Sequence, residues 1–181
     1  YMHWRLNRRS KVLAAIICLL VIIAFFIGIY AFWVPKRREA LICAKAEEFG
    51  VEEELVFAVI RAESNFRADA VSGAGAIGIM QLMPSTAQFM QTILGSSGEL
   101  TDPEENIRLG VGYLRYLSDR FDRLEEILAA YNAGEGTVRR WLSDPELTNS
   151  NGELICIPYP ETRSYVRRTK NFYFCYKFFY G

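Results

Sequence analysis

Residues 52–66 of the chain read EEELVFAVIRAESNF, and this segment indicates the fold class most directly. Three acids begin it, where the dipole at a helix N-terminus favours negative charge. Apolar residues then recur at the spacing that one face of an α-helix requires, namely Leu55, Val56, Val59 and Ile60. The pattern predicts an amphipathic helix over 52–66 that buries this stripe.

Glu63 lies on the predicted buried stripe rather than on the solvated face. It follows Ile60 by three residues and Val59 by four, which places the three side chains on one side of the helix. Burial raises the pKa of a carboxyl group, so Glu63 is a candidate general acid near neutral pH. A second interpretation stays open here, because a glutamate at a helix end can turn to solvent or pair with Arg61 or Arg67.

The rest of the body, from residue 39 onward, also has helical patterns. They cover 39–49, 84–94, 102–117, 124–133, 137–142 and 162–180, with an irregular stretch at 143–158. No convincing strand of more than three residues is found, and the aromatic residues of 172–180 fit a core-facing helix. The predicted fold class is therefore all-α, a helical globule of about 145 residues preceded by one N-terminal apolar helix.

A glycine-rich loop separates the helices predicted at 52–66 and 84–94. Its segment 73–78, GAGAIG, has the letters of a dinucleotide-binding motif, but that motif requires a preceding strand. A helix precedes it here, so we interpret the glycines as letting the backbone fold over a cleft or approach a ligand. Gln81 follows the loop, and a buried amide there needs a substrate or a backbone group as its partner.

Composition excludes several classes of protein. Lys and Arg together number 21, as do Asp and Glu, so the formal net charge is zero and a nucleic-acid-binding protein is not indicated. The single histidine, His3, is near the N-terminus, which excludes a Ser-His-Asp triad and a His-rich metal site from the body. The body contains Cys43, Cys156 and Cys175, for which buried free thiols are slightly preferred over one disulfide.

The N-terminal segment 12–34 is an uninterrupted run of 23 residues without charge. As a helix it would span roughly 34 Å at about 1.5 Å per residue, enough to cross a bilayer core of about 30 Å. A cleavable signal peptide has a shorter apolar region, and this run is not followed by the small residues that usually form the cleavage site. We therefore predict an uncleaved transmembrane anchor, with Tyr30 and Trp33 in the interfacial aromatic belt.

Flanking charges predict the orientation of the anchor. The tail, residues 1–11, carries four basic residues and no acid, whereas Lys36, Arg37 and Arg38 follow the apolar run. The positive-inside rule favours a cytoplasmic tail, because four basic residues precede the apolar run and three follow it. We expect a single-pass protein of the cell membrane, with its N-terminus in the cytoplasm and its body on the extracytoplasmic side.

Four motifs of the body match a known family when they are taken together. They are ESNF at 63–66, GIMQLMP at 78–84, AYNAG at 130–134 and PET at 160–162, with Ser72 after the first and Tyr165-Val166 after the last. In this order and spacing they closely resemble the catalytic domain of soluble lytic transglycosylases, relatives of goose-type lysozyme. The resemblance covers about 40–180 and implies a lysozyme-like helical fold for that domain.

The resemblance implies that the chain is a peptidoglycan lytic transglycosylase. Such an enzyme cleaves the β-1,4 bond between N-acetylmuramic acid and N-acetylglucosamine and leaves a 1,6-anhydro ring on the muramic acid. The implied partners are peptidoglycan glycan strands, with the membrane bound through 12–34. Envelope or secretion machinery is a further candidate partner.

The resemblance also implies the residues of the site. Glu63 corresponds to the sole catalytic carboxylate. Substrate-binding positions are, by the same resemblance, Ser72, Gln81, Tyr131, Asn132 and Glu161. Ser72 matches a serine that contacts the muramyl N-acetyl group, and Tyr131 matches a tyrosine near the acid. Two departures, Gly73 and Ile79, stand where the family more often has proline and leucine.

A single carboxylate is sufficient for the implied reaction. Glu63 would first protonate the glycosidic oxygen and then accept the proton of the C6 hydroxyl, whose attack is intramolecular. No metal or cofactor is needed. Two alternatives remain: a hydrolytic muramidase, which needs Asp69 or Glu161 as a second carboxylate, and a non-catalytic peptidoglycan-binding protein.

Overall fold

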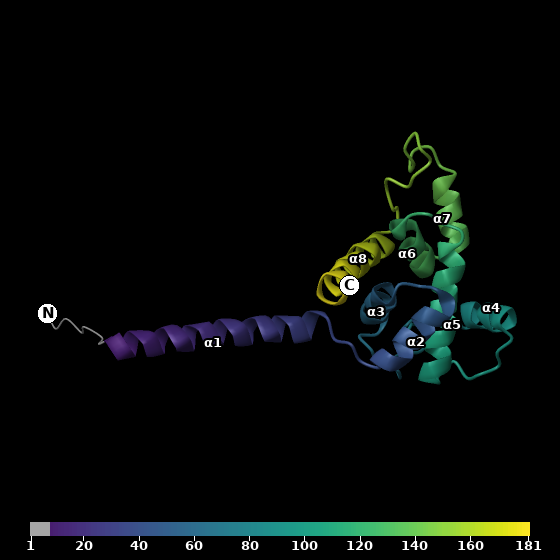
Figure 1. The fold of residues 1–181 in the computed structure, drawn as a ribbon. Helices are drawn as coiled ribbons and strands as arrows, with labels where there is room; N and C mark the ends of the chain where they lie inside the picture. Colours follow the sequence, from purple (N-terminus) through teal and green to yellow (C-terminus); the bar gives the residue numbers. More distant parts are fainter. Residues whose placement is uncertain (1–7) are drawn as a thin grey trace. The chain divides into compact units, whose positions relative to one another are not determined.

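The chain folds into helices joined by loops, as seen in a computed structural model that describes residues 8–181 (Figure 1). The side chains of residues 8 and 29–33 are not described, so the predicted tail at 1–7 and the roles predicted for Tyr30 and Trp33 lie outside the described residues. The chain divides into two compact units, one up to Pro35 and one from Lys36 to Gly181. The helices of the second unit are α2 Glu39–Phe49, α3 Glu53–Glu63, α4 Pro84–Leu94, α5 Pro103–Ser118, α6 Leu124–Ala133, α7 Glu135–Leu142 and α8 Pro160–Tyr180.

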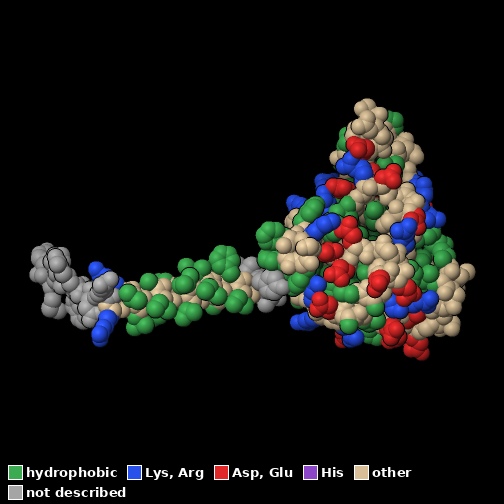
Figure 2. Space-filling view, in the orientation of Figure 1, with side chains coloured by type: hydrophobic (Ala, Val, Ile, Leu, Met, Phe, Trp, Pro, Cys, Tyr) green, Lys and Arg blue, Asp and Glu red, His purple; other side chains and the backbone are tan. Residues whose placement is uncertain are grey.

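The first unit contains α1, Arg8–Trp33, which holds all of the predicted apolar run 12–34 except its last residue. Figure 2 shows hydrophobic side chains along this helix and basic ones at its start. By length and composition α1 is able to cross a membrane, and a signal sequence near an N-terminus has the same properties. The predicted anchor and its orientation therefore remain predictions.

The second unit is organised around α3. Its residues from Leu55 to Ile60 are all buried, because α3 packs along α8 on one side and against α2 on another. α8 also packs against α6, and the long α5 lies against α2, α4 and α6 (Figure 1). Within the described residues β-structure is limited to isolated bridges. This architecture confirms the predicted all-α fold class.

Local sequence signals explain most of the helix ends. Gly50 and Gly95 adopt left-handed backbone conformations and end α2 and α4. At the start of α5 the Asp102 side chain accepts a hydrogen bond from the Glu105 amide at 3.3 Å, and Pro103 occupies the first helical position. α7 and α8 each begin two residues before the predicted start.

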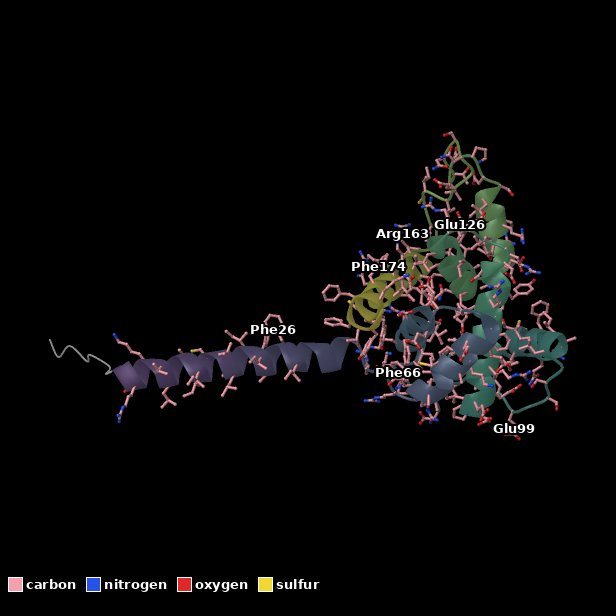
Figure 3. The ribbon with its side chains drawn as sticks, viewed as in Figure 1. Phe26, Phe66, Glu99, Glu126, Arg163 and Phe174 are labelled. Carbon is pink, nitrogen blue, oxygen red and sulfur yellow. The ribbon has the colours of Figure 1, made fainter. Side chains whose placement is uncertain are left out.

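The prediction for α3 was three residues too long at its C-terminus. The helix ends at Glu63 rather than at Phe66, because Asn65 and Phe66 have φ angles of 54° and 64°. These left-handed conformations reverse the chain. The ring of Phe66, labelled in Figure 3, packs against Phe57 with the ring centres 6.2 Å apart. Glu63 is therefore the last residue of its helix and lies where the chain turns.

The C-terminal helix buries only one side of its aromatic segment. Tyr173 and Tyr176 are buried, whereas Phe174, Phe178 and Phe179 are exposed. The core-facing helix predicted for 172–180 is therefore correct for the tyrosines and wrong for these phenylalanines.

The cysteines of the second unit are free. Cys156 is exposed, and Cys43 and Cys175 are partly exposed. The expectation that these thiols are buried was therefore wrong.

Candidate functional site

A cleft of about 220 Å³ opens at the C-terminal end of α3. The rest of its lining comes from loop 67–83, the first turn of α4, Tyr113 of α5, the end of α6 and the first turn of α8. All six residues that the sequence singled out line this cleft: Glu63, Ser72, Gln81, Tyr131, Asn132 and Glu161. The fold brings these distant positions together, and the role of each one remains a prediction.

Hydrogen bonds made by Ser64 and Arg67, which follow Glu63 in the sequence, fix the position of Glu63. Ser64 is buried, and its hydroxyl donates to the carbonyl of Ile79 in the loop at 2.7 Å. The side chain of Arg67 donates from Nε to the Ser64 carbonyl at 3.1 Å. These contacts tie the end of α3 to the loop, so the carboxyl group has a defined place in the cleft wall.

Burial raises the pKa of Glu63 from its ordinary value of 4.5 to about 7, while Tyr165 and Arg168 of α8 act in the opposite direction. The interpretation in which Glu63 turns to solvent or pairs with Arg67 does not hold, because Arg67 is bonded to Ser64 and the nearby cation is Arg168. A carboxyl group with this pKa is divided between its two protonation states at neutral pH. It is therefore able both to donate and to accept a proton.

Tyr165 is a site residue that the list drawn from the sequence missed. Its side chain is 3% exposed, and its hydroxyl has no hydrogen-bond partner at ordinary geometry within the described residues. It nevertheless lies close enough to Glu63 to lower the pKa of that carboxyl group. Burial and the charge of Glu63 raise the pKa of Tyr165 well above its usual value, which keeps the hydroxyl protonated.

Helical spacing was the signal that could have identified Tyr165 and Arg168 from the sequence. Tyr165 follows Glu161 by four positions and Arg168 follows it by seven, so the three share one face of α8. Arg168 also donates to the carbonyl of Ala62 at 3.5 Å, next to Glu63. One side of α8 thus faces the end of α3, and the Tyr165 hydroxyl and the Arg168 charge on that side lower the pKa of Glu63.

The loop residues Gln81 and Ser72 are held by backbone groups. Gln81 has a φ angle of 50°, and its Nε2 donates to the carbonyls of Ala70 at 3.0 Å and Gly78 at 2.8 Å. Only Oε1 of this amide can therefore bind a ligand without breaking those bonds. The Ser72 hydroxyl accepts a hydrogen bond from the Ala76 amide at 2.9 Å, which leaves its hydrogen for donation to a ligand.

Asn106 of α5 fixes the glycine-rich loop and was not found from the sequence. It is fully buried; its Oδ1 accepts from the Met80 amide, and its Nδ2 donates to the carbonyls of Ile77 and Leu100, each at 2.9 Å. Gly78 has a φ of 84°, and a Cβ there would lie 2.2 Å from Nδ2 of Asn106. Gly78 thus permits close packing of loop and helix, whereas the sequence suggested that the glycines bring backbone over a cleft or ligand.

Tyr131 connects the loop to α6. Its hydroxyl donates to the Met80 carbonyl at 2.9 Å, and its ring lies 5.5 Å from that of Tyr113, centre to centre. Burial, followed by the charge of Glu63, raises the pKa of Tyr131 well above its usual value. The residue is thus a neutral neighbour of the acid, while Asn132 and Glu161 are exposed at the cleft rim.

The two candidates for a second carboxylate lie in different places. Glu161 lines the cleft, whereas Asp69 lines a separate cavity with Ala68 and Val71. Among the residues that the structure describes, no group of three or more His, Cys, Asp or Glu side chains is placed to hold a metal ion. The chemistry available in the cleft is therefore that of carboxyl, hydroxyl and amide groups.

Comparison with known proteins finds the same family from sequence and from structure. The model of the transglycosylase SLT domain matches residues 40–151. The chain is 38% identical over 143 residues to the soluble lytic murein transglycosylase of Escherichia coli K12, covering 72% of this chain and 21% of that protein. It is 36% identical over 117 residues to membrane-bound lytic murein transglycosylase C of Yersinia enterocolitica, covering 57% of this chain and 33% of that protein. The chain thus spans about a fifth to a third of these relatives.

Two solved structures share the fold. An inactive Glu-to-Gln mutant of lytic transglycosylase Slt from Pseudomonas aeruginosa has a TM-score of 0.72 and 35% identity, covering 81% of this chain and 25% of that one. The 70 kDa soluble lytic transglycosylase of Escherichia coli has a TM-score of 0.76 and 31% identity, covering 84% of this chain and 26% of that one. The similarity confirms the lysozyme-like helical fold expected for the second unit.

Proposed function

The chain belongs to the transglycosylase SLT domain family, and from this premise we propose that it is a lytic transglycosylase acting on peptidoglycan. The proposed reaction cleaves the β-1,4 bond between N-acetylmuramic acid and N-acetylglucosamine and leaves a 1,6-anhydromuramic acid end. The observation that carries the proposal is a partly buried carboxyl group in a cleft, Glu63, whose pKa of about 7 suits proton transfer.

In this mechanism Glu63 acts twice. As an acid it donates its proton to the glycosidic oxygen, so that the bond to the anomeric carbon breaks. As a carboxylate it accepts the proton of the C6 hydroxyl, which closes the anhydro ring on the same sugar. The nucleophile belongs to the substrate, so its effective concentration is high and no second protein carboxylate has to attack or activate water.

The other cleft residues are proposed to bind the glycan strand. Ser72 has a hydroxyl hydrogen available, which suits donation to the carbonyl of an N-acetyl group. Gln81 offers Oε1, because its nitrogen is already bonded to the loop. Asn132 and Glu161 stand at the rim, where they can contact sugars on either side of the cleaved bond.

We further propose three regions for the chain: a cytoplasmic tail at 1–11, a transmembrane anchor at 12–34 and a catalytic domain at 40–180 outside the cytoplasm. The length and exposed apolar surface of α1 support the anchor. An anchor beside the wall would raise the local concentration of glycan strands around the cleft. It would also place the domain within reach of other envelope or secretion proteins.

The test of the reaction is product analysis with purified peptidoglycan. The wild type should release muropeptides with anhydro ends. Mass spectrometry identifies them, because their mass is lower by one water than that of the products of hydrolysis. Glu63→Gln should abolish release while binding of peptidoglycan remains, because the amide keeps the shape but cannot exchange a proton. Glu52→Gln is the matched control, since Glu52 bonds Tyr173 and Lys177 outside the cleft. Release at the wild-type rate by Glu63→Gln would refute the proposal.

Hydrolysis of the same bond is the second candidate, because Glu161 is a second carboxylate in the cleft. Products with a reducing muramic acid end would favour this muramidase activity, which should then be lost in Glu161→Gln. If Glu63→Gln binds peptidoglycan and the wild type releases nothing, the chain is instead a binding protein.

A further inference from the structure

A second groove, of about 300 Å³, opens beside the candidate cleft. It is lined by α4 and α5, which pack together (Figure 1), and by the first residue of α7. The lining residues are Ser85, Thr86, Phe89, Tyr113, Tyr116 and Glu135. Thr86 and Tyr113 also line the cleft that contains Glu63, so the two hollows meet at these side chains. We call the second hollow the side groove.

A row of aromatic rings leads from the cleft into the side groove. Tyr131 in the cleft lies 5.5 Å from Tyr113, centre to centre. Tyr113 stacks with Tyr116 at 6.0 Å, and Phe89 meets Tyr116 edge to face at 5.1 Å. The aromatic wall therefore continues from a neighbour of the acid to the surface of α4.

Phe89 is the ring of this row that a ligand is best able to cover. Its side chain is 42% exposed, whereas Tyr113 is only 8% exposed. The ring of Tyr116 is already contacted by the guanidinium of Arg120, which lies 3.4 Å from the ring centre. Ser85 precedes Phe89 by four positions and Thr86 by three, so two hydroxyl groups share its side of α4.

The charge in the side groove is already paired. Among the described residues that line it, Glu135 is the one with a charged side chain. Its Oε1 lies 2.7 Å from Arg139 and 3.5 Å from Nε of Arg120. The Tyr116 hydroxyl donates to its Oε2 at 3.0 Å. The lining therefore suits an uncharged ligand that has an apolar face and hydrogen-bonding groups around its edge.

We propose that the side groove binds an N-acetylglucosamine residue of the glycan strand that lies in the cleft, with Phe89 against the face of the sugar. This inference rests on the proposed function, which places the strand there. A pyranose ring carries C–H groups on its faces and polar groups at its edge, so it can cover Phe89 while Ser85 and Thr86 bond its edge. The muramic acid residues carry charged peptide stems, which selects the glucosamine.

Phe89 is thereby a residue that makes binding depend on strand length. A strand just long enough to fill the cleft does not reach the side groove, whereas a longer strand occupies both hollows. Contacts in the side groove are distant from the bond that breaks, so they should affect KM more than kcat.

The experiment measures kcat and KM of the full chain in detergent on short and long peptidoglycan strands that chromatography has separated. The variants are Phe89→Ala and Phe89→Tyr, of which the second keeps an aromatic ring. Phe174→Ala is the matched control, because Phe174 is an exposed phenylalanine of α8 that lines a different cavity. Thermal unfolding compares the stability of all variants.

We expect Phe89→Ala to raise KM for long strands roughly three- to tenfold more than for short ones, which is the size of one aromatic contact. Phe89→Tyr and Phe174→Ala should leave the ratio of the two KM values as in the wild type. An equal rise for short and long strands would overturn the proposal, since Phe89 would then act through the cleft. An unchanged KM for long strands would overturn it as well.

Strands whose peptide stems have been removed by an amidase identify the occupant. If a sugar covers Phe89, the effect of Phe89→Ala on long strands persists after this treatment. If the effect disappears, the side groove takes the peptide stem and the proposal is wrong. A wild type that releases no anhydro products from any strand would instead refute the proposed function, and this inference with it.

Discussion

The acid at the centre of the site owes its properties to the few residues around it. Burial raises the pKa of Glu63 to about 7, and the Tyr165 hydroxyl and the Arg168 guanidinium keep it from rising further. Without them the pKa would be higher, and the carboxylate form that the second half of the proposed reaction needs would be less populated at neutral pH. The α8 side chains thus shift the pKa of one group toward the range that both proton transfers of the proposed reaction require.

Tyr165→Phe should move the pH dependence of cleavage. Burial still raises the pKa of Glu63 in this variant, but the hydroxyl that lowers it is gone, so the pKa should rise above 7. The acid form then persists to higher pH, and the limb where the rate falls with rising pH should shift upward. Tyr173→Phe is the control, because Tyr173 lies on the same helix as Tyr165 but donates its hydroxyl to Glu52, outside the cleft. Identical rate profiles for both variants would show that Tyr165 does not act on the acid.

Glu63→Gln should be more stable than the wild type at pH 8 and about equally stable at pH 4. The folded pKa of about 7 exceeds the ordinary 4.5, so the native state binds more protons between these values and loses stability as pH rises. The full cost of the buried charge, present above pH 7, is about 3 kcal/mol at 1.36 kcal/mol per pKa unit. Urea unfolding at the two pH values measures it, and a difference that does not change with pH would contradict the raised pKa.

At the scale of elements, loop 67–83 shapes the cleft because α5 holds it in place. Asn106 bonds three backbone groups around the loop, and Gly78 packs directly against its side chain. Tyr131 of α6 adds a further bond to the loop at Met80. The positions of Ser72 and Gln81 therefore depend on a buried amide that is not itself part of the lining of the cleft.

Gly78→Ala should destabilise the domain strongly, and Gly75→Ala should do so weakly. Both glycines have positive φ angles, 84° and 88°, so each alanine costs about 1 kcal/mol in backbone strain. Only at Gly78 would the new methyl group clash with Asn106, which adds about 1–3 kcal/mol of overpacking. Thermal unfolding of the two variants compares these costs, and equal losses of stability would contradict the packing role of Gly78.

The sequence predicted the helices well where the signal is local, and the six candidate residues that it singled out line one cleft, although their roles remain predictions. Helical periodicity placed Glu63 on a buried stripe, and glycine and Asp-Pro signals located most helix ends. The end of α3 was missed, because nothing in the residue types of Asn65 and Phe66 requires left-handed conformations. Asn106 was missed since its three partners come from distant parts of the chain, and Tyr165 because its function depends on the packing of α8 on α3.

At the scale of the whole molecule, the cleft belongs entirely to the second unit. The residues that line it lie between Glu63 and Glu161, and the helices that position them pack among themselves. Of the described residues, those up to Pro35 contribute none of its lining. The proposed catalytic cleft and the proposed anchor therefore belong to different units of the chain.

Residues 36–181 expressed alone should fold and cleave purified, dispersed peptidoglycan at a rate close to that of the full chain in detergent. The measurement is the initial rate of release of muropeptides per mole of protein. A folded fragment, as judged by circular dichroism, that is many-fold less active would show that α1 takes part in forming the cleft.

The length of α8 has a consequence for what its two halves do. The helix runs from Pro160 to Tyr180, and Tyr165 and Arg168, which act on the pKa of Glu63, lie in its first half. Tyr173 and Tyr176 in the second half are buried, and Tyr176 stacks on Phe57. Substitutions in the second half should therefore weaken the fold without retuning the acid.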